Sequence, residues 1–221
     1  KNMSLTRDSR KLQEAMLAAL FPNHPYGTQT VLGTQEHLKN PSITNIKNYY
    51  NTWYVPNNMA ICLSGDFNPD EMIATIDKYF GGLQPNPNLP KLKMQEETEI
   101  SEPIVREVWG LDAETVALAW RFPGASSKEF ELLTVLSDVM YNGQAGLIDL
   151  NLNQQQKTLS AYSGAMSLSD YSIFLMQGYP KQGQTLDEVK DLLLAEMKKL
   201  RDGDFDEALL KGTLNTLKLY M

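Results

Sequence analysis

The chain has 221 residues, of which 42% are hydrophobic and 21% are charged, so it is long enough for one large or two ordinary globular domains. Its net charge of −7, without a cluster of Lys and Arg, argues against nucleic acid as a partner, because such binding needs basic side chains to displace counterions. No apolar run approaches the roughly 20 residues that span a bilayer, and a single cysteine excludes an internal disulfide.

The sequence pattern in the first third of the chain predicts short helices and one strand. Residues 8–21 have the apolar period of an amphipathic helix, which Pro22 ends. Ser42 is a good N-cap for a second helix that runs to about Tyr54. The apolar run from Met59 to Leu63 is typical of a buried strand.

Two expectations about burial follow from these elements. One face of the second helix is apolar and carries Ile43, Ile46, Tyr49, Tyr50 and Trp53. The aromatic side chains of this segment should pack in a core or between helices; they are Tyr49, Tyr50, Trp53 and Tyr54. Cys62 lies inside the apolar run, so we expect a small buried hydrophobic side chain there rather than a reactive thiol.

A domain boundary is expected near the middle of the chain. Asn68 caps a helix from Asp70 to Phe80, and Gly81 and Gly82 end it. The following stretch combines prolines with an acidic run and has no periodic pattern. We therefore expect residues 83–102 to be an interdomain linker.

Beyond the linker, strands come in adjacent pairs and helices follow them. The expected strands are 104–109, 114–122, 158–167 and 171–178, and the expected helices are 130–140, 147–152, 186–200 and 205–221. This grouping predicts an α+β fold, with an antiparallel-rich sheet and helices packed on one face, rather than a doubly wound sheet.

Few residues in the chain have a pattern that indicates chemistry. His24 and His37 flank a loop and lack the helical spacing of a zinc site, so we expect hydrogen-bonding loop histidines and no metal ligand. The carboxylates at Glu96 and Glu97 belong to the linker, and a second acidic group starts the last helix. Three tyrosines beside turns are open to two interpretations, structural packing or contact with an extended peptide at a strand edge; they are Tyr162, Tyr171 and Tyr179.

Three separated stretches of the chain resemble one family. The first stretch is His24-Pro25-Tyr26-Gly27, followed by Leu32-Gly33. The second is Tyr54-Val55-Pro56-Asn57-Asn58-Met59, which leads to Gly65-Asp66 and then to Lys78-Tyr79-Phe80-Gly81. The third comprises Val116–Trp120 with Phe122-Pro123, Leu159-Ser160-Ala161-Tyr162, and the helix that begins near Leu186. Together they are similar to segments of the M16 zinc metallopeptidases, the pitrilysin, insulinase and processing-peptidase family.

The resemblance implies a division into domains and a place for the metal. Residues 1–82 would be the C-terminal part of a first, catalytic-type M16 domain, and residues 103–221 most of a second, homologous one. In this family zinc is held by a His-x-x-Glu-His helix and a later glutamate, all upstream of the segment that resembles His24-Pro25-Tyr26-Gly27. Zinc would therefore belong to a longer parent protein, and none is expected on this chain.

The resemblance also singles out Tyr162. The family holds the substrate carbonyl with an Arg and a Tyr seven residues apart, and Tyr162 matches the tyrosine. Gln155 stands at the position of the arginine, and Lys157 is the cation nearby. Tyr162 is thus the one candidate substrate-binding residue, and no catalytic residue is carried over.

Three functional hypotheses remain open. The chain is an internal fragment of a zinc-dependent peptidase, in which it forms chamber wall and substrate-contacting surface and is inactive alone. Alternatively, it comes from a non-catalytic M16 homologue that acts as a peptide-binding or scaffolding subunit. In both cases the partners are a peptide and the remaining M16 domains or a paired homologous subunit. The third hypothesis is a generic α+β interaction module. The compartment cannot be inferred, because we expect the sequence to be an internal piece.

Overall fold

The computed structural model describes residues 6–220, except for the side chain of Tyr220, and these residues form two compact units. The first unit comprises residues 23–99, and the second comprises residues 6–22 together with 100–220. The boundary at residue 99 lies inside the stretch that the sequence marks as a linker. The N-terminal helix belongs to the second unit.

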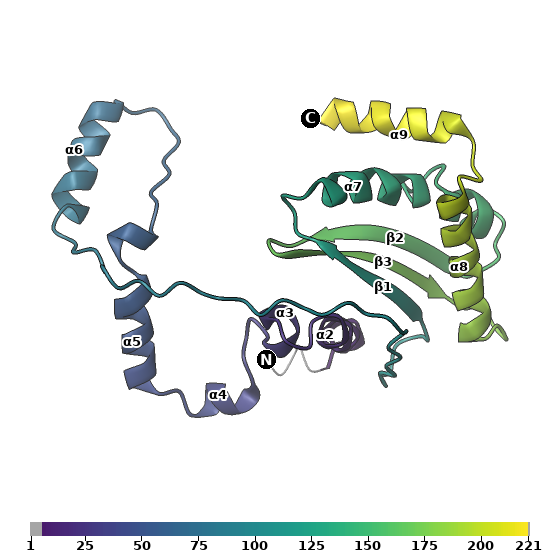
Figure 1. Ribbon diagram of the computed structural model, residues 1–221, viewed down its shortest axis with the longest axis horizontal. Coiled ribbons are helices and arrows are strands. Elements are labelled where there is room, and N and C mark those ends of the chain that lie inside the picture. The colour runs from purple at the N-terminus through teal and green to yellow at the C-terminus, as the bar shows by residue number, and fades with distance from the viewer. Residues whose placement is uncertain (1–5, 221) are drawn as a thin grey trace. The chain divides into compact units, whose positions relative to one another are not determined.

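The second unit is built on an antiparallel sheet, which Figure 1 shows in teal and green. Its strands are β1 (Val116–Pro123), β2 (Ser160–Ser167) and β3 (Tyr171–Tyr179), in the order β1-β3-β2. The hairpin of β2 and β3 and the alternating strand β1 confirm the sequence-based prediction, and the fold is α+β.

Local capping explains where the helices of the second unit begin and end. The helices are α2 (Asp8–Leu20), α7 (Lys128–Met140), α8 (Leu186–Asp202), α9 (Glu207–Tyr220) and the π-helical turn η2 (Asp149–Asn153). Thr185 and Glu188 form a reciprocal capping box at the start of α8. Gly203 ends α8 with φ of 70°, a left-handed conformation that glycine adopts without steric cost.

One face of the sheet carries the hydrophobic core. Phe174 and Met176 point from β3 toward α7 and α8, where they meet Leu133, Val189 and Leu193, all buried. The backbone of β3 comes very close to α8, since a Cβ at Gly178 would lie 2.5 Å from Cγ1 of Val189. A glycine is therefore needed at this position.

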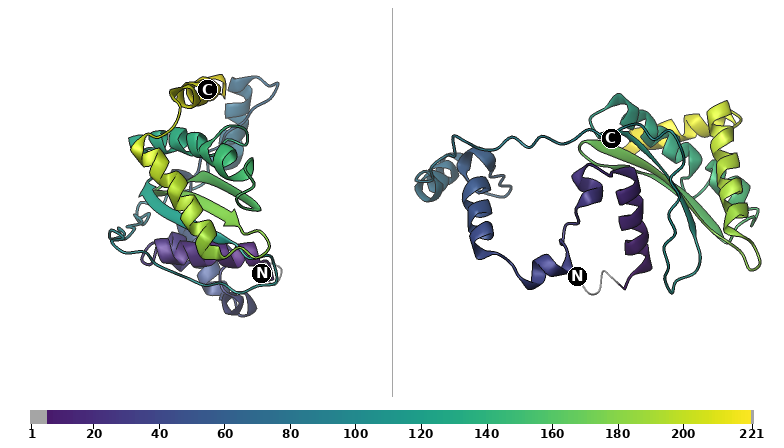
Figure 2. Two further views of the ribbon diagram at one scale, coloured as in Figure 1. Left: turned by 90° about the vertical axis from the view of Figure 1, so that its right-hand side faces the viewer. Right: turned by 60° about the horizontal axis from the view of Figure 1, so that its bottom comes forward.

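Helix α2 packs against β1 in the same unit, on the side of the sheet opposite α7 (Figure 2). The Arg121 guanidinium donates a hydrogen bond to the carbonyl oxygen of Leu20 and also lies over the ring of Phe21. The fully buried Phe21 ring is 5.4 Å from the ring of Tyr171. The last turn of α2 is thereby fixed to the sheet.

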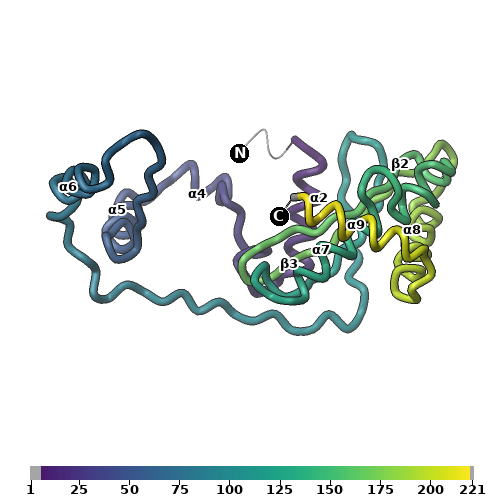
Figure 3. The backbone as a smooth tube through the Cα atoms, turned by 90° about the horizontal axis from the view of Figure 1, so that it is seen from above, coloured from purple at the N-terminus to yellow at the C-terminus, as the bar shows by residue number. Residues whose placement is uncertain are grey.

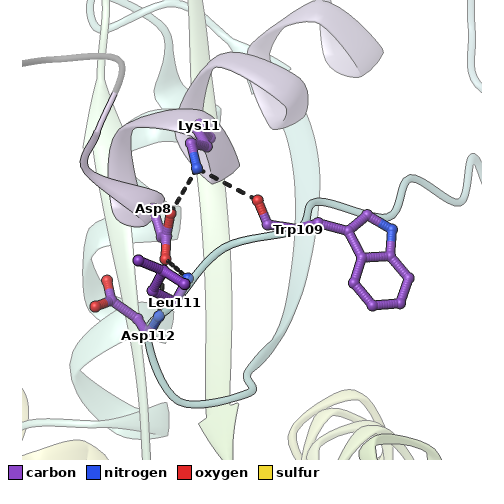
Figure 4. A network of polar contacts seen from close by, with 5 residues as sticks. All are labelled: Asp8, Lys11, Trp109, Leu111 and Asp112. Atoms are coloured by element: carbon purple, nitrogen blue, oxygen red, sulfur yellow. Dashed lines mark hydrogen bonds and ion pairs between the residues drawn. The ribbon is translucent and has the colours of Figure 1, made fainter. Parts of the chain in front are cut away.

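Asp8 fixes the first turn of α2 to the loop that precedes β1 (Figure 4). Its carboxylate accepts hydrogen bonds from the backbone N–H groups of Leu111 and Asp112, and from Nζ of Lys11 at 2.8 Å. The Lys11 hydrogen bond, followed by the backbone N–H groups, lowers the pKa of Asp8 from 3.8 to about 2.

The first unit consists of short helices without a core of their own. They are α3 (Pro25–Thr28), α4 (Gln35–Lys39), α5 (Ile43–Trp53), the 3₁₀ turn η1 (Pro56–Asn58) and α6 (Pro69–Phe80). None of these helices contains a buried residue. The predicted N-caps are confirmed, because Ser42 Oγ accepts from the N–H of Asn45 and Asn68 Oδ1 accepts from the N–H of Asp70.

Burial and one strand of the first unit were predicted wrongly. Residues 59–63 form no strand, and Cys62 is exposed instead of buried. The apolar face of α5 is also uncovered: Ile46 is 54% exposed and Tyr49 is 62% exposed. The physical reason is common to these errors. A strand needs a ladder partner and an apolar face needs a second layer, and residues 23–99 supply neither.

The connection between the units is extended, and Figure 3 shows its course as a teal tube. Residues 83–115 contain no helix or strand, so the predicted strand at 104–109 is wrong as well. Val105 and Trp109 are largely exposed and have no strand beside them. Glu97 is not a solvated linker residue, because its carboxylate accepts from the backbone N–H groups of Asn23 and His24 at 2.7 Å each.

Candidate functional site

Tyr162 lies on β2, at an edge of the described sheet. Its strand partner is Gln177, and the alternation of β3 places both side chains on the face opposite Phe174 and Met176. Tyr162 is half-buried, and its ring lies 6.4 Å from that of Tyr141. The candidate residue therefore lies on an edge strand and is partly accessible.

A chain of hydrogen bonds surrounds the Tyr162 hydroxyl. Tyr162 Oη donates to Oε1 of Gln177. Nε2 of Gln177 donates to Oγ1 of Thr115 at 3.0 Å and to Oη of Tyr179 at 3.1 Å. Thr115 in turn donates to the carbonyl oxygen of Gly178 at 2.9 Å. The network connects β2 and β3 with Thr115, the residue directly before β1, near one end of the sheet.

The same environment alters the ionisation of Tyr162. Burial raises the pKa of Tyr162 above its ordinary value of 10.0, and the nearby Tyr179 raises that pKa further by its charge and by a hydrogen bond. At neutral pH Tyr162 is thus a phenol with one O–H group. It acts as a hydrogen-bonding residue and not as a base.

The outer edge of β2 is closed at one end only. The Asn153 side chain pairs with the backbone of Ala161, accepting from its N–H and donating to its C=O at 2.8 Å each. Because outward and inward backbone groups alternate along an antiparallel strand, Ser163 and Ala165 also point their N–H and C=O groups away from β3. Beyond Ala161, this row of backbone groups has no strand beside it among the described residues.

The structure brings together only some of the residues that the sequence marks as candidates. Tyr162 and Tyr179 share the Gln177 network, whereas Tyr171 packs on Phe21. Gln155 and Lys157 lie exposed in the turn between η2 and β2.

Sequence reasoning missed Gln177 and Thr115. The available signal was a single amide, Gln177, directly after the apolar run from Ile173 to Met176 in the same expected strand. Such a side chain in a half-buried sheet needs partners. The pattern of one strand alone cannot say which residues across the sheet provide them.

The histidines do not form a metal centre with their neighbours. Nδ1 of His24 accepts the N–H of Tyr26 at 3.2 Å, and His37 lies in the short helix α4. Across residues 6–220, no three His, Cys, Asp or Glu side chains gather closely enough to hold a metal ion. The donor set of the described residues therefore does not fit zinc.

Residues 42–217 match the family model described as the Peptidase M16 inactive domain. The chain belongs to the M16 peptidase family. It is 25% identical over 193 residues to the zinc protease PqqE of Helicobacter pylori, covering 84% of this chain and 42% of that protein. It is 25% identical over 225 residues to presequence protease 1 of Arabidopsis thaliana, covering 90% of this chain and 19% of that protein. The chain thus spans less than half the length of these M16 relatives.

Solved structures of M16-type proteins share the fold. A protease from Helicobacter pylori superposes with a TM-score of 0.72 at 22% identity, over 96% of this chain and 55% of that one. Pitrilysin gives a TM-score of 0.59 at 19% identity, over 94% of this chain and 23% of that one.

Within residues 6–220, no helix has the length and apolar character that crossing a membrane requires.

Proposed function

We propose that this M16 domain forms wall and substrate-contacting surface of the peptide chamber of a zinc-dependent peptidase, and that it hydrolyses nothing by itself. The substrates would be peptides or unfolded segments. The single observation that carries the proposal is the open outer edge of β2 beside Tyr162. An extended peptide can pair with such an edge through its backbone while side chains on the adjoining face contact it.

We also propose the domain assignment that the resemblance implies. Residues 1–82 would complete a catalytic-type M16 domain whose remaining strands lie in other polypeptide, and residues 103–221 would be most of the second domain. The uncovered apolar face of α5 supports this assignment, because Ile46 and Tyr49 are exposed as a surface of this kind would be without its second layer.

A non-catalytic homologue is the second candidate, and a specific observation favours it. Gln155, an uncharged residue, stands where the family pattern has the arginine that would help Tyr162 to hold a substrate carbonyl. M16-type folds also occur both in long single chains and in assemblies. This chain covers 23% of the ferredoxin protease FusC, with a TM-score of 0.68, and 53% of a chain of complex III2 from Candida albicans, also with a TM-score of 0.68.

Peptide binding to the β2 edge can be tested with a proline substitution. Ala165→Pro removes an outward N–H without breaking the ladder to β3, since edge strands tolerate proline on their open side. We expect wild-type protein to bind fluorescein-labelled 12-residue unstructured peptides in an anisotropy titration, and Ala165→Pro to weaken this binding. Ala165→Val keeps the N–H and is the matched control. Equal binding by both variants would contradict the proposal.

The inactivity of the chain alone is tested by metal analysis and a peptidase assay. We expect less than stoichiometric zinc after incubation with zinc and removal of the excess, and no cleavage of the same peptides. One tightly held zinc per chain would overturn this expectation. A His-x-x-Glu-His helix in the polypeptide that carries this chain would favour the peptidase over the non-catalytic homologue.

A further inference from the structure

The loop between α7 and η2 closes on one carboxylate oxygen. Oδ2 of Asp149, a residue only 5% exposed, accepts hydrogen bonds from the N–H of Asn142 at 3.1 Å and from the N–H of Gly146 at 3.0 Å. A Cβ at Gly146 would lie 2.7 Å from Cα of Tyr141, so the backbone folds back tightly there. The loop is thus anchored at both ends, and the residues between the anchors, 143–145, are exposed.

The side chain of Asn142 is held in this loop, and its neighbours determine which of its end atoms is the oxygen. The backbone N–H groups of Gln144 and Ala145 donate to Oδ1 at 3.0 Å and 2.9 Å. Nδ2 donates to the carbonyl oxygen of Asp138 at 3.1 Å. Exchanging the amide oxygen and nitrogen would set donors against donors, so only this orientation satisfies all three contacts.

The arrangement contains the parts of an acyl-transfer site. Two N–H groups on a carbonyl oxygen polarise its C=O bond, and they stabilise the oxyanion that forms when a nucleophile attacks the carbon. The next backbone nitrogen, that of Gly143, can act as this nucleophile, because its N–H donates to no group among residues 6–220. No atom lies within 4 Å of the Cβ position of Gly143, so neither its own side chain nor a neighbour shields it.

We propose that Asn142 is a self-modification site, at which the nitrogen of Gly143 attacks Cγ of Asn142 and ammonia leaves. The bond from this nitrogen to Cγ forms and the bond from Cγ to Nδ2 breaks, while the proton of Gly143 passes through solvent to the departing nitrogen. Water then opens the five-membered imide at either carbonyl carbon and leaves aspartate or isoaspartate in place of the asparagine. Asn142 is the one asparagine of the chain that a glycine follows. The reaction does not depend on peptide binding.

Either product changes the loop. The new carboxylate has no proton to donate to the carbonyl oxygen of Asp138, and its negative charge is added beside Asp149. In isoaspartate the main chain is also one atom longer between the two N–H groups that meet at Oδ2 of Asp149. We therefore expect the second unit of the reacted chain to melt at a lower temperature.

The test compares the reaction in the folded and the unfolded chain. The full chain is incubated at neutral pH in buffer or in concentrated urea, and mass spectrometry of tryptic peptides follows the conversion of amide to acid at Asn142. We expect the half-life to be about tenfold shorter in the folded chain, because the N–H pair is oriented only there. A half-life in the folded chain that is equal or longer would overturn the proposal.

Variants at position 145 test the N–H pair itself. Ala145→Pro removes one of the two groups that donate to Oδ1 of Asn142, so the folded chain should react several-fold more slowly, with no change in urea. Ala145→Ser keeps the N–H and is the matched control, and circular dichroism melts confirm that both variants are folded. Equal half-lives of the two folded variants would contradict the role of the N–H pair.

Asn142→Gln tests the consequence for stability. Its side chain is one methylene longer, so the five-membered ring cannot form. We expect this variant to keep its melting temperature through the incubation, while that of the wild-type chain falls as the acid accumulates. Equal falls in both proteins would contradict the proposed effect on the loop.

Discussion

Helices α5 and α8 have the same kind of sequence and opposite surroundings. Both are amphipathic and both begin at a side-chain N-cap, Ser42 or Thr185. In α8 the apolar stripe is covered, so that Leu193 is 0% exposed, whereas Ile46 of α5 is 54% exposed. The difference shows that the pattern of a helix determines where it forms, and that only a second layer of structure decides whether its apolar face is buried.

The largest expected effect comes from truncating a side chain in the covered stripe. Leu193→Ala should lower the free energy of unfolding of the second unit by about 3 kcal/mol, because it removes buried methyl groups and leaves a cavity. Ile46→Ala in the exposed stripe of α5, which belongs to the first unit, should change the free energy of unfolding of the chain by less than about 0.5 kcal/mol. Urea denaturation followed by circular dichroism measures both values. Equal losses would mean that α5 is buried as deeply as α8.

Adding a methyl group to β3 should have the next largest effect. Gly178→Ala places a Cβ 2.5 Å from Val189 and 3.3 Å from Leu193, so we expect a loss of about 1–3 kcal/mol. Gly164→Ala on β2 is the matched control, since no atom lies within 4 Å of its new Cβ. The control should melt at or slightly above the wild-type temperature. A neutral Gly178→Ala would contradict the close packing of α8 on the sheet.

A smaller, pH-dependent effect is expected from Asp8. Its pKa is lowered from 3.8 to about 2 in the folded chain, so its contribution to stability is present above pH 3.8 and is lost as the pH falls through about 2. Asp8→Asn should lower the melting temperature near neutral pH and reduce its fall across this acid range. Melts at several pH values measure this dependence, and identical slopes for both proteins would refute the role of Asp8.

The smallest effect concerns the ionisation of Tyr162. Tyr179→Phe removes the charge and the hydrogen bond that help to raise the pKa of Tyr162, so that pKa should move back toward 10.0. Burial of the ring remains, and the return should therefore be incomplete. Ultraviolet titration of tyrosinate absorbance measures it, with Tyr162→Phe identifying the relevant transition. No change in the titration would mean that Tyr179 does not act on Tyr162.

The linear sequence predicted best what depends on near neighbours. The N-caps Ser42 and Asn68 and the hairpin of β2 and β3 all depend on contacts within a few residues, and the structure confirms them. The run from Met59 to Leu63 failed as a strand for the opposite reason. Its conformation and burial require a partner that the described residues do not contain.

The candidate site was predictable in part for the same reason. Tyr162 followed from the family resemblance, and Tyr179 from its place beside a turn. Gln177 and Thr115 join Tyr162 only across the sheet, through a register that a single strand does not specify.

The most direct measurement of the central contrast is amide hydrogen exchange, followed by mass spectrometry of peptic fragments. Residues 60–64 have no ladder partner in the structure, whereas residues 173–177 of β3 pair on both sides. The account predicts that amides of 60–64 exchange within seconds and that those of 173–177 exchange only when the second unit unfolds. Comparable protection of the two segments would contradict the claim that the first unit has no partner for its apolar surface.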